Sequence, residues 1–109
     1  MTDVEKCEKN FNLAFRSNVV SIQNICEYVK SHNKNCYFIN ISTDHLYNGK
    51  GPHKEENINL INNYALTKYL GEEISSKVNS INLRVNFFGN NFLKEKGLVN
   101  WFLNACKNK

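Results

Sequence analysis

The chain has 109 residues, enough for one small domain that buries about two thirds of its unfolded surface at best. Hydrophobic residues make up 41% and aromatic residues 12%, within the globular range, and no repeat or low-complexity tract interrupts them. The net charge is +4, but the basic residues are scattered from Lys6 to Lys109, so no basic stripe indicates nucleic acid or a membrane surface. With no signal peptide and no apolar run near the ~20 residues of a membrane span, we expect a cytoplasmic protein.

The first predicted element is a long amphipathic helix from about Phe11 to His32. Its apolar residues recur mostly at three-to-four spacing, as on one face of a helix. They are Leu13, Val19, Val20, Ile22, Ile25, Cys26 and Val29. The polar run HNKN ends this helix, and the β-rich segment CYFINIS follows at residues 36–42. Turn formers flank that segment, which is typical of a strand covered on both faces.

A long loop then separates this strand from a second helix and a second strand. Residues 43–63 contain two glycines and the only proline, which predicts an irregular loop of the kind that often carries function. Helical periodicity returns over residues 64–77, where we expect Glu72 and Glu73 to point to solvent. INLRVNFF at residues 81–88 predicts the second strand, and residues 98–106 a last helix.

The alternation of helices and strands predicts an α/β fold, with a partial Rossmann-like parallel sheet and flanking helices. Two strands do not complete a doubly wound sheet, and no strand in the sequence leads into a glycine-rich turn. We therefore expect residues 1–109 to form an incomplete doubly wound domain that is a fragment of something larger.

Polar side chains follow each predicted strand directly. In open parallel sheets, ligands bind beyond the carboxyl ends of the strands. The residues at these ends are Ser42, Thr43 and Asp44 after the first strand, and Asn86 and Phe87 at the end of the second. A right-handed crossover places the helix between the strands against the same sheet, so its side chains are expected in the same pocket.

That helix carries Tyr64 and Lys68, four residues apart and hence on one face. The ordinary pKa of a tyrosine is near ~10, too high for proton exchange at neutral pH, but a neighbouring cation favours the phenolate and lowers the pKa. Together with the hydroxyl of Thr43, the pair predicts an acid/base site.

The cysteines and histidines indicate no metal site. The four cysteines show no C-x-x-C pairing, and Cys26 and Cys36 fall in apolar segments, so we expect buried, reduced thiols. The histidines at positions 32, 45 and 53 lie in polar stretches without metal-ligand spacing and are expected to be solvated.

Three motifs follow one another along the chain: INISTDHLYNGKGPHKEE at residues 39–56, NNYALTKYLGEE at 62–73 and LRVNFFG at 83–89. In this order they resemble the extended short-chain dehydrogenase/reductase family, and within it the dTDP-4-dehydrorhamnose reductases and related nucleotide-sugar reductases. The likeness runs from about Asp3 to Trp101. It implies a Rossmann fold, NADPH or NADH as cofactor, and reduction of a 4-keto nucleotide-linked deoxysugar.

The resemblance also implies roles for single residues. Thr43, Tyr64 and Lys68 match the family's catalytic residues, and Asn18 matches the asparagine that often completes the set. Tyr64 would protonate the alkoxide, while Lys68 would hold the nicotinamide ribose. In all, the cofactor-binding set is Tyr64, Lys68 and Ser42, and the substrate-binding set is Thr43, Asp44, Asn86 and Phe87. The resemblance is compatible with a homodimer.

The chain departs from the family in what it lacks and at a few positions. The glycine-rich N-terminal half and most of the sugar-binding lobe have no counterpart, so residues 1–109 are expected to be the central and C-terminal part of a NAD(P)-binding Rossmann domain. Ala65 stands where the family usually has glycine, while His45 and Asn48 replace a common tyrosine and aspartate. These replacements concern the substrate more than the fold.

Two other interpretations remain open. One is a non-catalytic regulatory subunit of the same fold that binds the cofactor and a partner protein. The other is an inactive truncated fragment without cofactor binding, whose exposed sheet edge would favour association.

Overall fold

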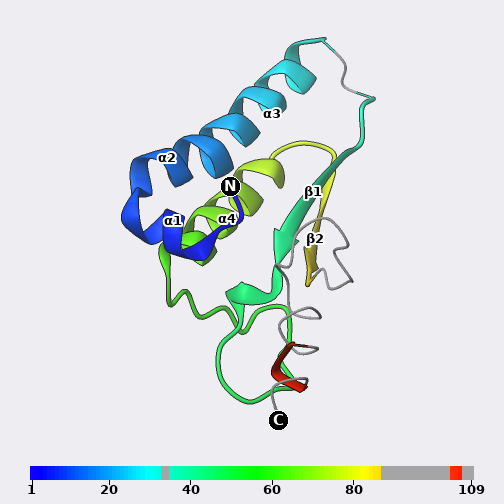
Figure 1. The fold of residues 1–109 in the computed structure, drawn as a ribbon. Helices are drawn as coiled ribbons and strands as arrows, with labels where there is room; N and C mark the ends of the chain where they lie inside the picture. Colours follow the sequence, from blue (N-terminus) through cyan, green and yellow to red (C-terminus); the bar gives the residue numbers. More distant parts are fainter. Residues whose placement is uncertain (33–34, 87–103, 107–109) are drawn as a thin grey trace.

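The computed structural model describes residues 1–32, 35–86 and 104–106, and its elements form two layers (Figure 1). The helical layer contains α1 (Val4–Lys9), α2 (Phe11–Phe15), a π-helical segment η1 (Arg16–Val20), α3 (Ser21–His32) and α4 (Asn63–Ser75). The other layer is a sheet of β1 (Phe38–Thr43) and β2 (Ser80–Val85), and a short 3-10 turn η2 (Asp44–Leu46) follows β1. Helix α4 lies between the sheet and the N-terminal helices.

The two strands are parallel and are joined through α4. Their register runs from Phe38 opposite Ser80 to Thr43 opposite Val85, so both carboxyl ends lie at one edge of the sheet. Parallel neighbours need a crossover connection, and α4 supplies it. The predicted α/β fold, a partial Rossmann-like parallel sheet with flanking helices, is confirmed.

The helix predicted over residues 11–32 is interrupted. The backbone from Phe11 to His32 is helical, but Arg16–Val20 forms a π-helical turn between α2 and α3. Such turns occur as single bulges within α-helices. The short helix α1 was not predicted, because it spans only 6 residues and is mostly polar. Asn10 separates it from α2, with a side chain that accepts a hydrogen bond from the backbone nitrogen of Leu13.

Polar side chains fill the interface between α4 and the sheet. The amide of Asn40 on β1 donates to Asn82 Oδ1 on β2 at 2.7 Å, and Ser75 Oγ of α4 donates to the same oxygen at 2.6 Å. Asn40 and Ser75 are both buried. Because buried polar groups cost free energy unless they are paired, this network is one reason why the two layers keep a fixed relative position.

The opposite face of the sheet is apolar and exposed among the described residues, contrary to the prediction of a strand covered on both faces. Its side chains alternate with the polar ones along both strands. They are Ile39 at 53% exposure, Ile41 at 42%, Ile81 at 41% and Leu83 at 37%.

The N-terminal helices pack closely against α4. Cys7, Ala14 and Tyr64 form a small buried cluster between α1, α2 and the start of α4. Farther along α4, Gly71 lies so close to η1 that a Cβ atom there would come within 2.7 Å of the backbone oxygen of Asn18. Glycine at this position therefore allows the close helix contact.

The cysteines are free, but only two of them are buried as expected. Cys7 and Cys26 are buried, Cys36 is half-buried, and Cys106 is exposed. Burial raises the pKa of both Cys7 and Cys26, so these thiols are held in the neutral form. Cys36 and Cys106 are less buried than the sequence predicted.

Two further findings apply only to residues 1–32, 35–86 and 104–106. No helix there is both long and apolar enough to span a bilayer. In the same ranges, no group of three or more cysteine, histidine or carboxylate side chains is arranged to hold a metal ion. Most of the last predicted helix, residues 98–106, lies outside the described part of the chain.

Candidate active site

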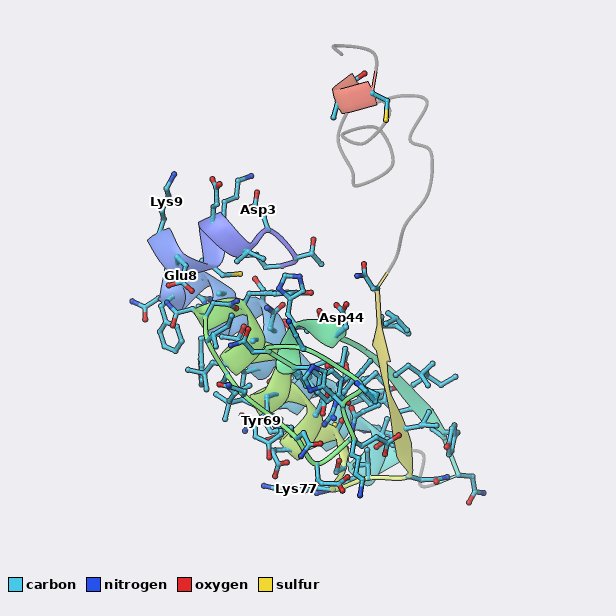
Figure 2. The ribbon with its side chains drawn as sticks, turned by 90° about the horizontal axis from the view of Figure 1, so that it is seen from below. Asp3, Glu8, Lys9, Asp44, Tyr69 and Lys77 are labelled. Atoms are coloured by element: carbon cyan, nitrogen blue, oxygen red, sulfur yellow. The ribbon has the colours of Figure 1, made fainter. Side chains whose placement is uncertain are left out.

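A cleft of about 530 Å³ opens at the carboxyl ends of β1 and β2. In Figure 2, Asp44 lies at this end of the sheet, opposite to Lys77, which follows α4. The lining residues come from the N-terminus, from both strand ends and from α4: Thr2, Val4, Ile41, Ser42, Thr43, Asp44, His45, Tyr64, Lys68, Val85 and Asn86. The structure thus brings together six of the site residues predicted from the sequence.

Thr43 and Asp44 are held at the end of β1 by local hydrogen bonds. Thr43 is buried, and its Oγ1 accepts from the backbone nitrogen of His45 at 3.2 Å. Since this bond uses only an acceptor site, the hydroxyl proton of Thr43 remains available for a ligand. Asp44 Oδ2 accepts from Asn86 Nδ2 at 2.8 Å, which links the ends of the two strands.

Tyr64 lies at the start of α4, where the helix is capped by Asn62. The Asn62 side chain accepts from the backbone nitrogen of Ala65 at 2.7 Å. The ring of Tyr64 is buried against Cys7 and Ala14 and meets the His45 ring edge-on, with the centroids 5.5 Å apart. Packing on these sides fixes the ring, and the same residue lines the cleft.

Lys68 lies one turn farther along α4 and also lines the cleft. Its ammonium donates a hydrogen bond to the backbone oxygen of Ile41 on β1. Burial lowers the pKa of Lys68, and the negative charge of Glu72 opposes this by raising it. The cleft therefore holds an ammonium group within reach of the strand end.

Ser42 is buried, and its hydroxyl oxygen has no hydrogen-bond partner among the described residues. Buried hydroxyls are normally paired, so an orphaned one beside a cleft is a candidate ligand contact. Ser42, Lys68 and the hydroxyl of Tyr64 form a polar set of the kind that a ribose or an amide needs. These residues fit a nicotinamide cofactor.

Asn18 does not line the cleft. It is buried within η1, where its Nδ2 donates to Thr67 Oγ1 of α4 at 3.1 Å and to the backbone oxygen of Met1 at 3.0 Å. Its side chain therefore joins η1 to α4 and to the N-terminus. Phe87, predicted to contact substrate, lies outside the described residues.

Glu72 is buried, and the prediction that it points to solvent was wrong. Only 4% of this residue is exposed. Its carboxylate accepts hydrogen bonds from Arg84 Nε at 3.0 Å and Arg84 Nη2 at 2.8 Å. Glu73, the next residue, is exposed as predicted.

Sequence reasoning also missed some residues of the cleft. The prediction of a solvated His45 is confirmed, because the side chain is exposed, but its place at the cleft with its ring against Tyr64 was not foreseen. Its place two residues after Thr43 was the available signal. Thr2 and Val4 carried no signal, because they reach the cleft only through the packing of α1 against α4.

Comparisons with known proteins agree on one family. A family model described as the RmlD substrate binding domain matches residues 1–107. A solved structure described as a hypothetical dTDP-4-dehydrorhamnose reductase from Sulfolobus tokodaii is 36% identical, with a TM-score of 0.75, and the match covers 89% of this chain and 34% of that one. A dTDP-4-dehydrorhamnose reductase from Clostridium acetobutylicum is 26% identical, also with a TM-score of 0.75, covering 98% of this chain and 38% of that one.

The chain thus spans about a third of the length of these two solved structures. A comparison with curated protein sequences found no match.

Proposed function

This chain belongs to the RmlD substrate binding domain family, and from that premise we propose that its cleft is the reducing site of a nucleotide-sugar reductase. The proposed substrate is a 4-keto nucleotide-linked deoxysugar such as dTDP-4-dehydrorhamnose. The two solved relatives, which are described as dTDP-4-dehydrorhamnose reductases, support this class of reaction. The observation that carries the proposal is that Thr43, Tyr64 and Lys68 line one cleft at the carboxyl ends of two parallel strands.

In the proposed reaction, the hydroxyl of Thr43 donates a hydrogen bond to the ketone oxygen and positions it. A nicotinamide cofactor, when bound, supplies the hydride that reduces the ketone carbon. The Tyr64 phenol gives its proton to the ketone oxygen as negative charge develops there, so the product is an alcohol. The ammonium of Lys68 stabilises the negative charge left on the phenol oxygen and binds the cofactor ribose.

The remaining predicted residues have narrower roles in this proposal. Ser42 contacts the cofactor through its unpaired hydroxyl. Asp44 and Asn86, which are hydrogen-bonded to each other, contact the sugar. We give Asn18 no contact with the reacting atoms, because its side chain is used between η1 and α4. NADPH is the proposed cofactor, with NADH as the other choice.

The proposal assigns residues 1–109 to the central and C-terminal part of a NAD(P)-binding Rossmann domain. The two solved relatives, each matched over about a third of its length, support this assignment. The cytoplasmic location and a homodimer remain predictions.

The proposal is tested by NADPH binding and by turnover of dTDP-4-dehydrorhamnose. We expect Tyr64→Phe to keep measurable NADPH binding, because Ser42 and Lys68 remain, but to lower kcat by about 10²–10⁴-fold, the usual contribution of a positioned acid. Tyr69→Phe, at the residue directly after Lys68 and outside the cleft lining, is the matched control and should keep full activity. Full activity of Tyr64→Phe contradicts the proposal, whereas NADPH binding without any turnover favours the regulatory-subunit interpretation.

A further inference from the structure

Arg84 joins three segments of the chain by direct contacts. From β2, its guanidinium donates to both carboxylate oxygens of Glu72 on α4. Its Nη1 donates to the hydroxyl of Tyr47 at 2.7 Å and to the backbone oxygen of Glu55 at 2.6 Å, both in the segment after β1. The guanidinium also lies over the Tyr47 ring, 5.4 Å from its centroid. A planar group with five donors suits such a junction, because it satisfies several acceptors in fixed directions.

Each of these segments carries part of the proposed site. Helix α4 carries Tyr64 and Lys68, and β2 leads within two residues from Arg84 to Asn86. Strand β1 ends at Thr43, and the segment after it begins with Asp44 and reaches Tyr47 directly after η2. Arg84 does not itself line the cleft. Its contacts therefore fix the walls of the cleft relative to one another from outside.

Glu72 contacts Arg84 and lies on the same side of α4 as Lys68. It lies four residues after Lys68, and thus on the same face of α4, with 4% of its surface exposed. A buried carboxylate needs a partner, and the guanidinium of Arg84 provides it. Among the described residues, the titratable groups that share the cleft with Lys68 are Tyr64 from its own helix and Asp44 and His45 from the segment after β1. Glu72 acts on Lys68 through its charge and is itself paired with Arg84 of β2.

We propose that Glu72 and Arg84 are positioning residues, which hold Tyr64 and Lys68 of α4 against Thr43 and Asp44 at the end of β1. This inference rests on the proposed function and adds to it two residues that touch neither substrate nor cofactor. Glu72 also acts on Lys68 through its charge, since it opposes the effect of burial on the ammonium. That electrostatic effect separates the inference from a purely structural role.

The decisive variant is Glu72→Gln, which keeps the shape of the side chain and removes its charge. Glu73→Gln, the exposed neighbour, is the matched control. The lysines are labelled by reductive ¹³C-methylation, and the Lys68 signal, assigned with Lys68→Met, is titrated by NMR. We expect the titration midpoint of Lys68 to fall in Glu72→Gln and to stay unchanged in Glu73→Gln. A loosened fold would expose the ammonium and raise the midpoint, so a rise or an unchanged midpoint in Glu72→Gln overturns the inference.

A milder variant, Tyr47→Phe, tests the other arm of the junction without breaking the ion pair. It removes only the hydroxyl that Arg84 contacts. We expect faster amide hydrogen exchange at residues 43–47, with exchange in α4 unchanged. Unchanged exchange at residues 43–47 means that the contact does not hold this segment and contradicts the inference.

Neither readout needs cofactor or substrate, so both stand apart from the test of the proposed function. Failure of the wild-type protein to bind NADPH counts against the proposed function, while the Lys68 titration still decides the role of Glu72. If NADPH does bind, we expect Glu72→Gln to lose affinity at alkaline pH, where Lys68 loses its charge first, and to match Glu73→Gln at pH 6. Equal affinity of the two variants at every pH contradicts the inference.

Discussion

At the scale of single residues, Lys68 is the group on which the site depends most. It is held between two opposing influences: burial favours its neutral form, and Glu72 favours its charged form. Burial is the larger influence, so the pKa of Lys68 lies below its ordinary value of 10.5.

The lowered pKa of Lys68 makes stability depend on pH in the alkaline range. Between the folded pKa and 10.5, the unfolded chain binds more protons than the folded one, so the free energy of unfolding should rise with pH in this window. Lys68→Met removes this component. We expect the free energy of unfolding of the wild type, minus that of the variant, to increase as pH rises through that window, measured by urea unfolding. Other groups that titrate at alkaline pH are common to both proteins, so they cancel in this difference. A difference that does not change with pH contradicts the predicted effect of Lys68.

Gly71 sets the distance between α4 and η1. In Gly71→Ala, the new Cβ would meet the Asn18 backbone oxygen at 2.7 Å, and a backbone atom has little freedom to move away. We expect a loss of about 1–3 kcal/mol in the free energy of unfolding, as for other overpacked sites. Gly51→Ala is the control, because its Cβ would meet nothing closer than 3.6 Å. Equal stabilities of the two variants in urea unfolding would show that the helices can separate at no cost.

At the scale of elements, the buried ion pair between α4 and β2 is the strongest single link that we can test. Arg84→Met leaves Glu72 buried without its partner, and we expect a loss of about 3 kcal/mol, near the lower end for buried pairs because Arg84 keeps some exposure. Adding Glu72→Leu removes the unpaired charge and should restore part of this loss. Both are measured by urea unfolding.

The surface pair of Lys6 and Asp3 is the control for this measurement. Its atoms are 3.8 Å apart and both side chains are largely exposed, so Lys6→Met should change stability by less than about 1 kcal/mol. If Arg84→Met costs no more than Lys6→Met, the ion pair of Glu72 and Arg84 does not stabilise the fold.

The elements could be predicted from the sequence where one periodicity dominates. Spacing placed α4 within two residues of its ends, and the β-rich run predicted at residues 36–42 overlaps all of β1 except Thr43. Glu72 was misjudged because adjacent acidic residues usually lie on a solvated face. Yet its place eight residues after Tyr64, just over two helical turns, puts it on the face of Tyr64 and Lys68, so the signal was present.

Other features depend on packing between distant segments and leave no local pattern. The π-helical turn of η1 lies within an unbroken helical periodicity and leaves no sign in the spacing, and the hydrogen bond of Asn18 to Thr67 joins residues 49 apart in the chain. The cleft itself was predictable, because the rule for strand ends needs only the order of the elements. The covered face of the sheet could not be predicted, because the alternation of apolar and polar residues along a strand shows that there are two faces but not what packs on each.

At the scale of the whole molecule, the sheet is polar toward α4 and apolar on the face that the described residues leave open. Parallel sheets usually have both faces covered, so the open face predicts association. Ile39 and Ile81 are opposite each other in the register and lie on this face. We expect the double variant Ile39→Thr and Ile81→Thr to reduce self-association in sedimentation velocity runs at high protein concentration.

A change at an equally exposed apolar residue elsewhere provides the comparison. Ile25 on α3 is 43% exposed, and Ile25→Thr should leave association as it is in the wild type. An equal effect of Ile25→Thr would mean that general hydrophobicity, rather than the open face of the sheet, drives association.

The π-helical turn at Arg16–Val20 has a consequence for how the N-terminal helices tolerate insertions and deletions. Its i→i+5 hydrogen bonds take up one residue more than an α-helical turn, and each residue advances an α-helix by about 100°. Because the bulge absorbs that residue locally, deleting one residue there would let an ordinary helix run from α2 into α3 with α3 in nearly its present orientation. If the same five residues instead became α-helical without a deletion, α3 would rotate by about that angle, and Cys26 and Val29, now buried, would turn away from α4. The π-helical turn thus keeps the angular phase of α3 despite the extra residue.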